Sequence, residues 1–146
     1  MSIKRRALTS ALESAHREEV GAAALLNSIA SAIRDAQLHG TFLQFGAQET
    51  GGVATVEGLL ESRGVGRPML LPVTRLCAAV RGRAARMRPW RSVVEDVLDR
   101  TERRAQRISE AASNARLAGD LDAARSLGFL KDNAGTQAAW FREFLR

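Results

Sequence analysis

The sequence predicts an all-α protein, built as a bundle of four long amphipathic helices. Three observations lead to this prediction. The composition is rich in Ala, Arg and Leu, with three prolines and no tyrosine, and such a mixture favours helix. Apolar residues recur at spacings of three and four along most of the chain, as they do on one face of a helix. The length of 146 residues fits a single domain, residues 1–146, with a buried core.

The first two helices are expected to meet at a short turn. The first runs from about residue 10 to residue 38, and Gly40 ends it. Thr41 and Gln44 match the capping box T-x-x-Q and open the second helix. Gly64 is a suitable left-handed end for that helix. The apolar stripes are Leu8, Leu12, Ala15, Ala22, Leu26, Ile29 and Ile33 in the first helix, and Phe42, Phe45, Val53, Val56, Leu59 and Leu60 in the second.

A long connection, from about residue 64 to residue 90, separates this pair from the next. Glycines and prolines stand at its start, and a short helix is expected over residues 73–87. The short helix is predicted because four apolar residues share one of its faces. These residues are Leu76, Val80, Ala84 and Met87.

The third and fourth helices form a second pair with a short turn between them. Ser92 and Glu95 match the capping box S-x-x-E and open the third helix. Gly119 ends it, and Asp120 can cap the fourth helix, which reaches the C-terminus. The stripes are Val94, Val97, Leu98, Ala105, Ile108, Ala112 and Ala115, followed by Leu121, Ala124, Leu127, Leu130, Ala134, Phe141 and Leu145.

Short turns make neighbouring helices antiparallel, whereas a connection of this length can cross the bundle from end to end. We therefore expect two antiparallel helical hairpins joined by a long crossover that contains a short helix. Two alternatives are an up-down bundle with a decorated loop and a long hairpin pair that dimerises.

Polar residues interrupt the apolar stripes at a few positions. Glu49 falls on the second stripe, Glu19 falls on the first, and His16 lies one turn before Glu19. In di-metal bundles, carboxylates project inward from each helix and two helices carry Glu-x-x-His. On the second pair of helices Glu102 is at the edge of its stripe, whereas Asp132 lies further off and Asn133 and Gln137 point inward better.

The chain resembles the ferritin-like superfamily, in particular its small bacterial rubrerythrin-like members. FLQFGAQETGGVATVEGLLESRG is similar to the second helix of that family, and ARLAGDLDAARSLGFLKDNAGTQAAWFREFL is similar to its last turn and fourth helix. The resemblance implies a four-helix bundle with a crossover. Gly52 stands where the family has its first ligand histidine, and Gly135 or Thr136 stands where it has the second. The resemblance therefore implies the fold without an intact di-iron site.

Two functions follow from these residues. The first is a non-enzymatic binding or assembly module, in which the space at Gly52 either is filled by Trp140, Phe141 or Phe42 or forms a small pocket. That pocket would be lined by Gly52, Asn133 and Gln137, with Glu49 as its polar group. The alternative is a redox or stress-response protein that holds Fe or Mn in a remodelled carboxylate site. The ligands of that site would be His16, Glu19, Glu49 and Glu102.

The net charge of +6 comes from one segment, because no acid lies between Glu61 and Glu95. Such a segment can meet an acidic protein, nucleic acid or an anionic membrane surface. It can equally be a solvated crossover whose arginines pair with nearby acids such as Glu57 and Asp96. A homodimer is expected from the family resemblance. The basic residues of the expected patch are Arg75, Arg81, Arg83, Arg86, Arg88 and Arg91.

Other signals limit the functional classes. The single Cys77 excludes a disulfide framework and indicates a reducing compartment, so a cytoplasmic protein is expected. Cys77 itself is predicted to be a small buried hydrophobe, and His39 is predicted to be a charge at the end of the first helix. The sequence contains no secretory signal, membrane span, P-loop, dinucleotide fingerprint, CxxC pair or recognisable nucleophile–base pair.

Overall fold

The computed structural model describes residues 2–66 and 71–146, which are helical over most of their length and contain no strand. The prediction of an all-α chain is confirmed. Part of the expected crossover, residues 67–70, lies outside the described residues. The elements are α1 (Ile3–Ala32), α2 (Ala36–Glu61), α3 (Leu71–Ala84), the 3₁₀ turn η1 (Ala85–Met87), α4 (Trp90–Leu117) and α5 (Leu121–Leu145).

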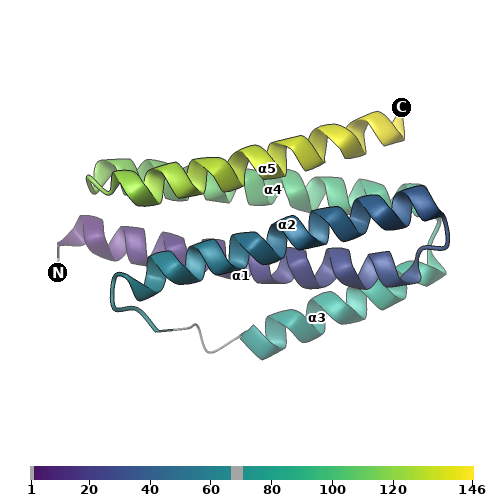
Figure 1. The fold of residues 1–146 in the computed structure, drawn as a ribbon, viewed down its shortest axis with the longest axis horizontal. Coiled ribbons are helices and arrows are strands. Elements are labelled where there is room, and N and C mark those ends of the chain that lie inside the picture. Colours follow the sequence, from purple (N-terminus) through teal and green to yellow (C-terminus); the bar gives the residue numbers. More distant parts are fainter. Residues whose placement is uncertain (1, 67–70) are drawn as a thin grey trace.

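The four long helices form two antiparallel hairpins, α1–α2 and α4–α5, that lie against each other (Figure 1). Helix α1 packs on α4, and α2 packs on α5. Helix α3 lies along the outer side of α1 and brings the chain back to the end of the bundle where α4 begins (Figure 1). The order along the chain is therefore hairpin, crossover helix, hairpin.

The turn between α1 and α2 lies earlier than the sequence pattern predicted. The carboxylate of Asp35 accepts a hydrogen bond of 2.9 Å from the backbone N–H of Leu38 and so caps α2. Gly40 and Thr41 consequently lie inside α2, and the helix end and the capping box predicted there were wrong. A glycine in mid-helix costs only about 1 kcal/mol, which a good cap upstream offsets.

Because the turn was predicted too late in the chain, the prediction that His39 lies at the end of the first helix was also wrong. His39 lies in the first turn of α2, and its Nδ1 is 2.8 Å from the carbonyl oxygen of Ala30 near the end of α1. The imidazole therefore ties the two helices together across their turn instead of ending the first helix.

The other helix ends match their signals better. Gly64 and Gly119 have φ angles of 69° and 76°, the left-handed conformation that glycine adopts at helix ends. Asp120 caps α5 by accepting a 3.0 Å bond from the N–H of Ala123, as predicted. The capping box at Ser92 was wrong, because α4 begins at Trp90, directly after its N-cap residue Pro89.

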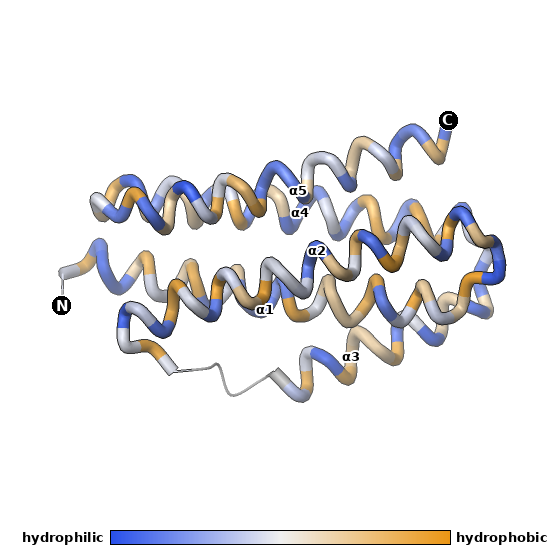
Figure 2. Tube along the Cα trace, in the orientation of Figure 1, coloured by the Kyte–Doolittle hydropathy of each residue, from blue (hydrophilic) through white to orange (hydrophobic). Residues whose placement is uncertain are grey.

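Two apolar clusters fill the bundle, one at each end, and Figure 2 shows that all five helices carry hydrophobic residues along their length. We call them the first core and the second core. The second core holds aromatic contacts, including Phe42 to Phe141 with ring centroids 5.6 Å apart. The first core is centred on Leu12, Val56, Ile108 and Leu127, and the second on Leu26, Phe42, Val94 and Phe141.

Helix α3 packs on α1 through small residues. A Cβ atom on Gly82 would come within 2.3 Å of Ser28, and the Ser28 hydroxyl donates a 3.1 Å hydrogen bond to the carbonyl oxygen of Ala79. Because the small residues face inward, the predicted apolar stripe of this helix faces outward. Its exposed members include Leu76, Val80 and, in η1, Met87. Cys77 is exposed as well, so the prediction that it is buried was wrong.

Candidate functional site

A layer of buried polar side chains separates the two cores. Each long helix contributes to it: Glu19 from α1, Glu49 from α2, Thr101 and Arg104 from α4, and Gln137 from α5. None of the five residues is more than 4 % exposed. We call this set the central polar layer. Buried polar groups are costly unless they are paired, so their partners decide what the layer can do.

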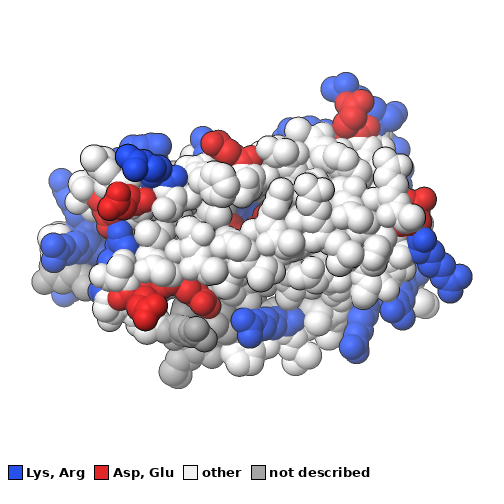
Figure 3. Space-filling model, in the orientation of Figure 1, with Lys and Arg blue, Asp and Glu red and all other residues white. Residues whose placement is uncertain are grey.

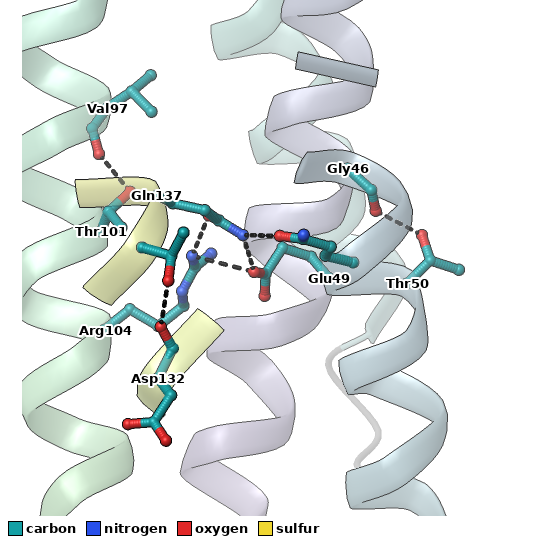
Figure 4. Close-up of polar contacts among 10 residues, drawn as sticks. Gly46, Glu49, Thr50, Val97, Thr101, Arg104, Asp132 and Gln137 are labelled. Atoms are coloured by element: carbon teal, nitrogen blue, oxygen red, sulfur yellow. Dashed lines mark hydrogen bonds and ion pairs between the residues drawn. The ribbon is translucent and has the colours of Figure 1, made fainter. Parts of the chain in front are cut away.

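Glu49 is the acceptor at the middle of the central polar layer (Figure 4). Its Oε1 accepts 2.6 Å and 3.3 Å hydrogen bonds from Gln137 Nε2 and Arg104 NH2. The same Arg104 nitrogen donates a 2.8 Å bond to Gln137 Oε1. Three side chains from three helices thus form a closed network, in which the guanidinium neutralises the carboxylate.

Glu19 lies beside this network but is held differently. Neither of its carboxylate oxygens has a hydrogen-bond partner among the described residues. Burial, followed by the neighbouring Glu49, raises the pKa of Glu19 to about 10, although the charge of Arg104 acts in the opposite direction. Glu19 is therefore a neutral acid at physiological pH. The layer then contains one negative and one positive charge, and it has no net charge.

Gly52 is the position where the resemblance expects a ligand histidine. A Cβ atom there would come within 2.6 Å of Glu19 Oε2 and within 3.2 Å of Leu130 Cδ2. The space at Gly52 is therefore taken by Glu19 and Leu130. The aromatic residues expected to fill it lie in or against the second core instead: Phe42, Phe141 and Trp140.

His16 is fully buried, one turn from Glu19, as its place on the stripe indicated. Its Nε2 is 3.1 Å from Glu57 Oε1, and its Nδ1 has no partner among the described residues. Glu102 does not join this group. It lies on the surface, where the guanidinium of Arg142 donates bonds of 2.6 Å and 3.0 Å to its Oε1.

The second pair of helices otherwise contributes less than the sequence pattern suggested. Gln137 is fully buried, but Asn133 is only half-buried and Asp132 is exposed. The structure therefore brings together Glu19, Glu49 and Gln137, with Gly52 against Glu19 and His16 buried one turn away. Glu102 and Asp132 are exposed, and Asn133 is half-buried.

The donor set does not fit a di-iron centre. No group of three or more His, Cys, Asp or Glu residues within 2–66 and 71–146 could hold a metal ion. Beside Glu49, where the predicted metal site would hold a cation, lies the guanidinium of Arg104. A second cation at this carboxylate would be repelled by the first.

Thr101 and Arg104 were not predicted from the sequence, although a signal was present. Steps of three and four from Val94 and Val97 lead directly to Thr101 and Arg104, and then to Ile108. The predicted stripe passed instead through apolar residues beside this line. A search for apolar residues alone does not detect a buried polar layer, because it treats every charged residue as exposed.

The arginines of the expected basic patch have different partners. Arg88 pairs with Asp96 at 3.6 Å, and Arg91 pairs with Glu95 at 3.4 Å. Arg81 is exposed, and Arg75, Arg83 and Arg86 are exposed on α3 and η1. Figure 3 shows several basic groups along the lower right edge, where α3 and its connection to α4 lie, with acidic atoms beside them at the right end.

No family model matches the chain, and no match was found among curated proteins. Within residues 2–66 and 71–146, every helix is too short or too polar to span a lipid bilayer. Function is therefore inferred from the geometry of the helices and of the central polar layer.

Proposed function

We propose that this chain is a divergent ferritin-like binding and assembly module that works without a di-iron site. The order of hairpin, crossover helix and hairpin supports the ferritin-like part of the proposal. So does the position of acidic side chains from two helices at the middle of the bundle.

One observation carries the loss of the metal site: Arg104 forms a buried ion pair with Glu49. A buried carboxylate needs a compensating cation or a proton. Here Arg104 compensates Glu49 and a proton compensates Glu19. The interior charges are thus balanced by the chain itself, which favours a structural role for this layer.

The alternative is a metal-dependent redox or stress-response protein. It is favoured by the oxygens of Glu19 and the Nδ1 of His16, two donor groups on one helix face that have no partner among the described residues. Carboxylate and imidazole together suit Fe or Mn. The two functions predict different metal contents.

Metal analysis of the full chain separates them. The protein is exposed to Fe(II) or Mn(II), freed of unbound metal by gel filtration and assayed by mass spectrometry. We expect wild type and Glu49→Gln to retain the same background amount. Stoichiometric metal in the wild type that Glu49→Gln lacks would establish the metalloprotein instead.

The assembly part of the proposal is supported by the outer face of α3, where Leu76 and Val80 are 65 % and 58 % exposed. A second copy of the chain can cover this face, since exposed apolar surface favours association. We expect a dimer in light scattering, and a monomer for Leu76→Glu/Val80→Glu. Leu121→Glu, at an exposed apolar position on α5, is the matched control and is expected to remain dimeric. A monomeric wild type would contradict the proposed assembly.

A further inference from the structure

An open groove of about 500 Å³ runs between α1, α3 and α4. This volume is in the range of pockets that hold small molecules. Glu18 is the single acid among the described residues that line it, against six arginines. The arginines are Arg17, Arg81, Arg100, Arg103, Arg104 and Arg107.

Four of these arginines come from α4, and their spacing places them on one face. Arg100, Arg103, Arg104 and Arg107 follow one another at i, i+3, i+4 and i+7, the pattern that normally marks the apolar stripe of a helix. With a rise of 1.5 Å per residue, the row extends for roughly 10 Å. A row of this length can hold two anionic groups at once.

The groove retains unsatisfied positive charge. Arg100 pairs with Asp96 at 3.4 Å, Arg103 pairs with Asp99 at 2.6 Å, and Arg107 pairs with Glu18. By contrast, no ion pair or hydrogen bond joins Arg17 or Arg81 to another described residue. Arg17 and Arg107 lie toward one end of the groove and Arg81 and Arg100 toward the other, as the order of residues along α1, α3 and α4 requires.

Arg104 connects the groove with the central polar layer. Its side chain is 4 % exposed and lines the groove, and its Nε has no acceptor among the described residues. Leaving a buried N–H without a hydrogen-bond acceptor costs free energy. An anionic group bound in the groove would supply an acceptor for the Nε–H of Arg104.

The body of the ligand follows from the remaining lining. Between Arg17 and the end marked by Arg81, the lining includes aliphatic side chains, among them Ala22 and Leu25 on α1 and Ala78 on α3. No aromatic ring lines it among the described residues, so it lacks the stacking surface that recognises a nucleobase. An aliphatic chain fits the middle, and anionic groups fit the ends.

We infer that this groove binds an extended aliphatic molecule that carries an anionic group, carboxylate or phosphate, at each end. The inference rests on the proposed binding function and names its ligand class. Arginine suits both anions because its planar fork donates two parallel hydrogen bonds. The arginines at the two ends of the groove each hold one anionic group.

Calorimetric titration of the full chain at low salt tests this inference. The probes are decanedioate, decane-1,10-diyl bisphosphate, decanoate and inorganic tripolyphosphate. We expect one of the two-ended probes to bind at least about tenfold more tightly than decanoate and than tripolyphosphate. Tighter binding of the carboxylate or of the phosphate probe then identifies the end group.

Arg17→Gln and Arg81→Gln probe the two ends, because neither side chain supports the fold through an ion pair. Each is expected to reduce the affinity of the two-ended probe by about tenfold, toward that of decanoate. Arg125→Gln, an exposed arginine of α5 outside the groove, is the control and is expected to bind as the wild type does.

Three results would overturn the inference. No binding of any probe would exclude the site. Binding of both two-ended probes no tighter than that of decanoate would exclude two-ended recognition, and tightest binding of tripolyphosphate would exclude the aliphatic body. These results are independent of the metal analysis. A failure of the groove inference can therefore be told apart from a failure of the proposed function, which would show as metal bound to the wild type.

Discussion

The two apolar cores and the central polar layer stabilise the same bundle by different physical means. In the cores, residues such as Leu12, Ile108 and Leu127 are completely buried and contribute through burial of apolar surface, which is nondirectional. In the layer, Glu49 and Arg104 contribute only while each has the other. Shortening one side chain of a core therefore costs stability in proportion to the apolar surface that is lost. Removing one partner of the ion pair leaves the other charge buried without compensation.

The cores and the layer also differ in their response to pH and in the specificity they confer. The two cores are clusters of apolar side chains, while the layer contains a carboxyl with a strongly raised pKa. Its hydrogen bonds join α2, α4 and α5 at fixed positions. A paired polar layer thus sets the register of the helices at the cost of some stability.

The largest expected effect comes from breaking the ion pair of the layer. Arg104→Met leaves Glu49 buried without its cation, and we expect unfolding in urea to show a loss of about 3 to 5 kcal/mol. The double variant Arg104→Met/Glu49→Leu removes both charges and is expected to recover most of this loss. A double variant as unstable as the single one would argue against the ion pair as the cause.

A deletion in the first core has a somewhat smaller expected effect. Leu127→Ala creates a cavity in a completely buried site, which costs about 3 kcal/mol. The loss should be the same at acidic and alkaline pH, since no titratable group is involved. Leu121→Ala, at the exposed start of the same helix, is the matched control and should stay near wild-type stability in the same urea titration.

The pH dependence of the layer gives the third prediction. Between the ordinary pKa of 4.5 and the folded-state value of about 10, the unfolded chain releases the Glu19 proton and the folded chain retains it. Rising pH therefore destabilises the wild type through this group, by at most about 1.4 kcal/mol per pH unit. The effect is absent below the lower pKa and constant above the upper one.

Glu19→Gln removes this titration and keeps a side chain of similar shape. We expect its stability relative to the wild type to increase steadily between about pH 6 and pH 9, measured by urea unfolding at several pH values. Parallel stability curves for the two proteins would show that Glu19 does not retain its proton on folding.

The smallest expected change in stability comes from alanine substitutions at two adjacent glycines. A Cβ atom on Gly51 would meet no neighbouring group within 4 Å, whereas a Cβ atom on Gly52 would contact Glu19 at 2.6 Å. Gly51→Ala should stabilise the protein by up to about 1 kcal/mol, through helix propensity. Gly52→Ala should be less stable than Gly51→Ala by about 1 to 2 kcal/mol, because Glu19 must move. Equal thermal midpoints would mean that the space at Gly52 is free.

Much of the site was visible in the pattern of single helices. Glu19, Glu49 and Gln137 were predicted to point inward because they continue their stripes, and all three are buried. Arg104 continues its stripe equally well but was not predicted, since an arginine is expected on the surface. The row Arg100, Arg103, Arg104 and Arg107 is hard to see in the sequence because Glu102 lies among these residues, although its side chain lies on the protein surface.

The errors in the fold were local ones. Gly40 and Thr41 predicted a helix boundary, but the Asp35 cap six residues before Thr41 determined where α2 begins. Cys77 was expected to be buried, yet Gly82 allows this helix to approach Ser28 closely with its opposite face. Close packing selected the face with the smallest side chains rather than the most apolar one.

The sequence by itself determined the helices, their left-handed glycine ends at Gly64 and Gly119, and the inward direction of Glu19 and Glu49. These properties depend on residues within a few positions of one another and on the 3.6-residue period. The tertiary structure decided which group neutralises Glu49, what occupies the space at Gly52 and which arginines share a groove. Each of these depends on how neighbouring helices are rotated and shifted against one another, and the period of a single helix does not specify that.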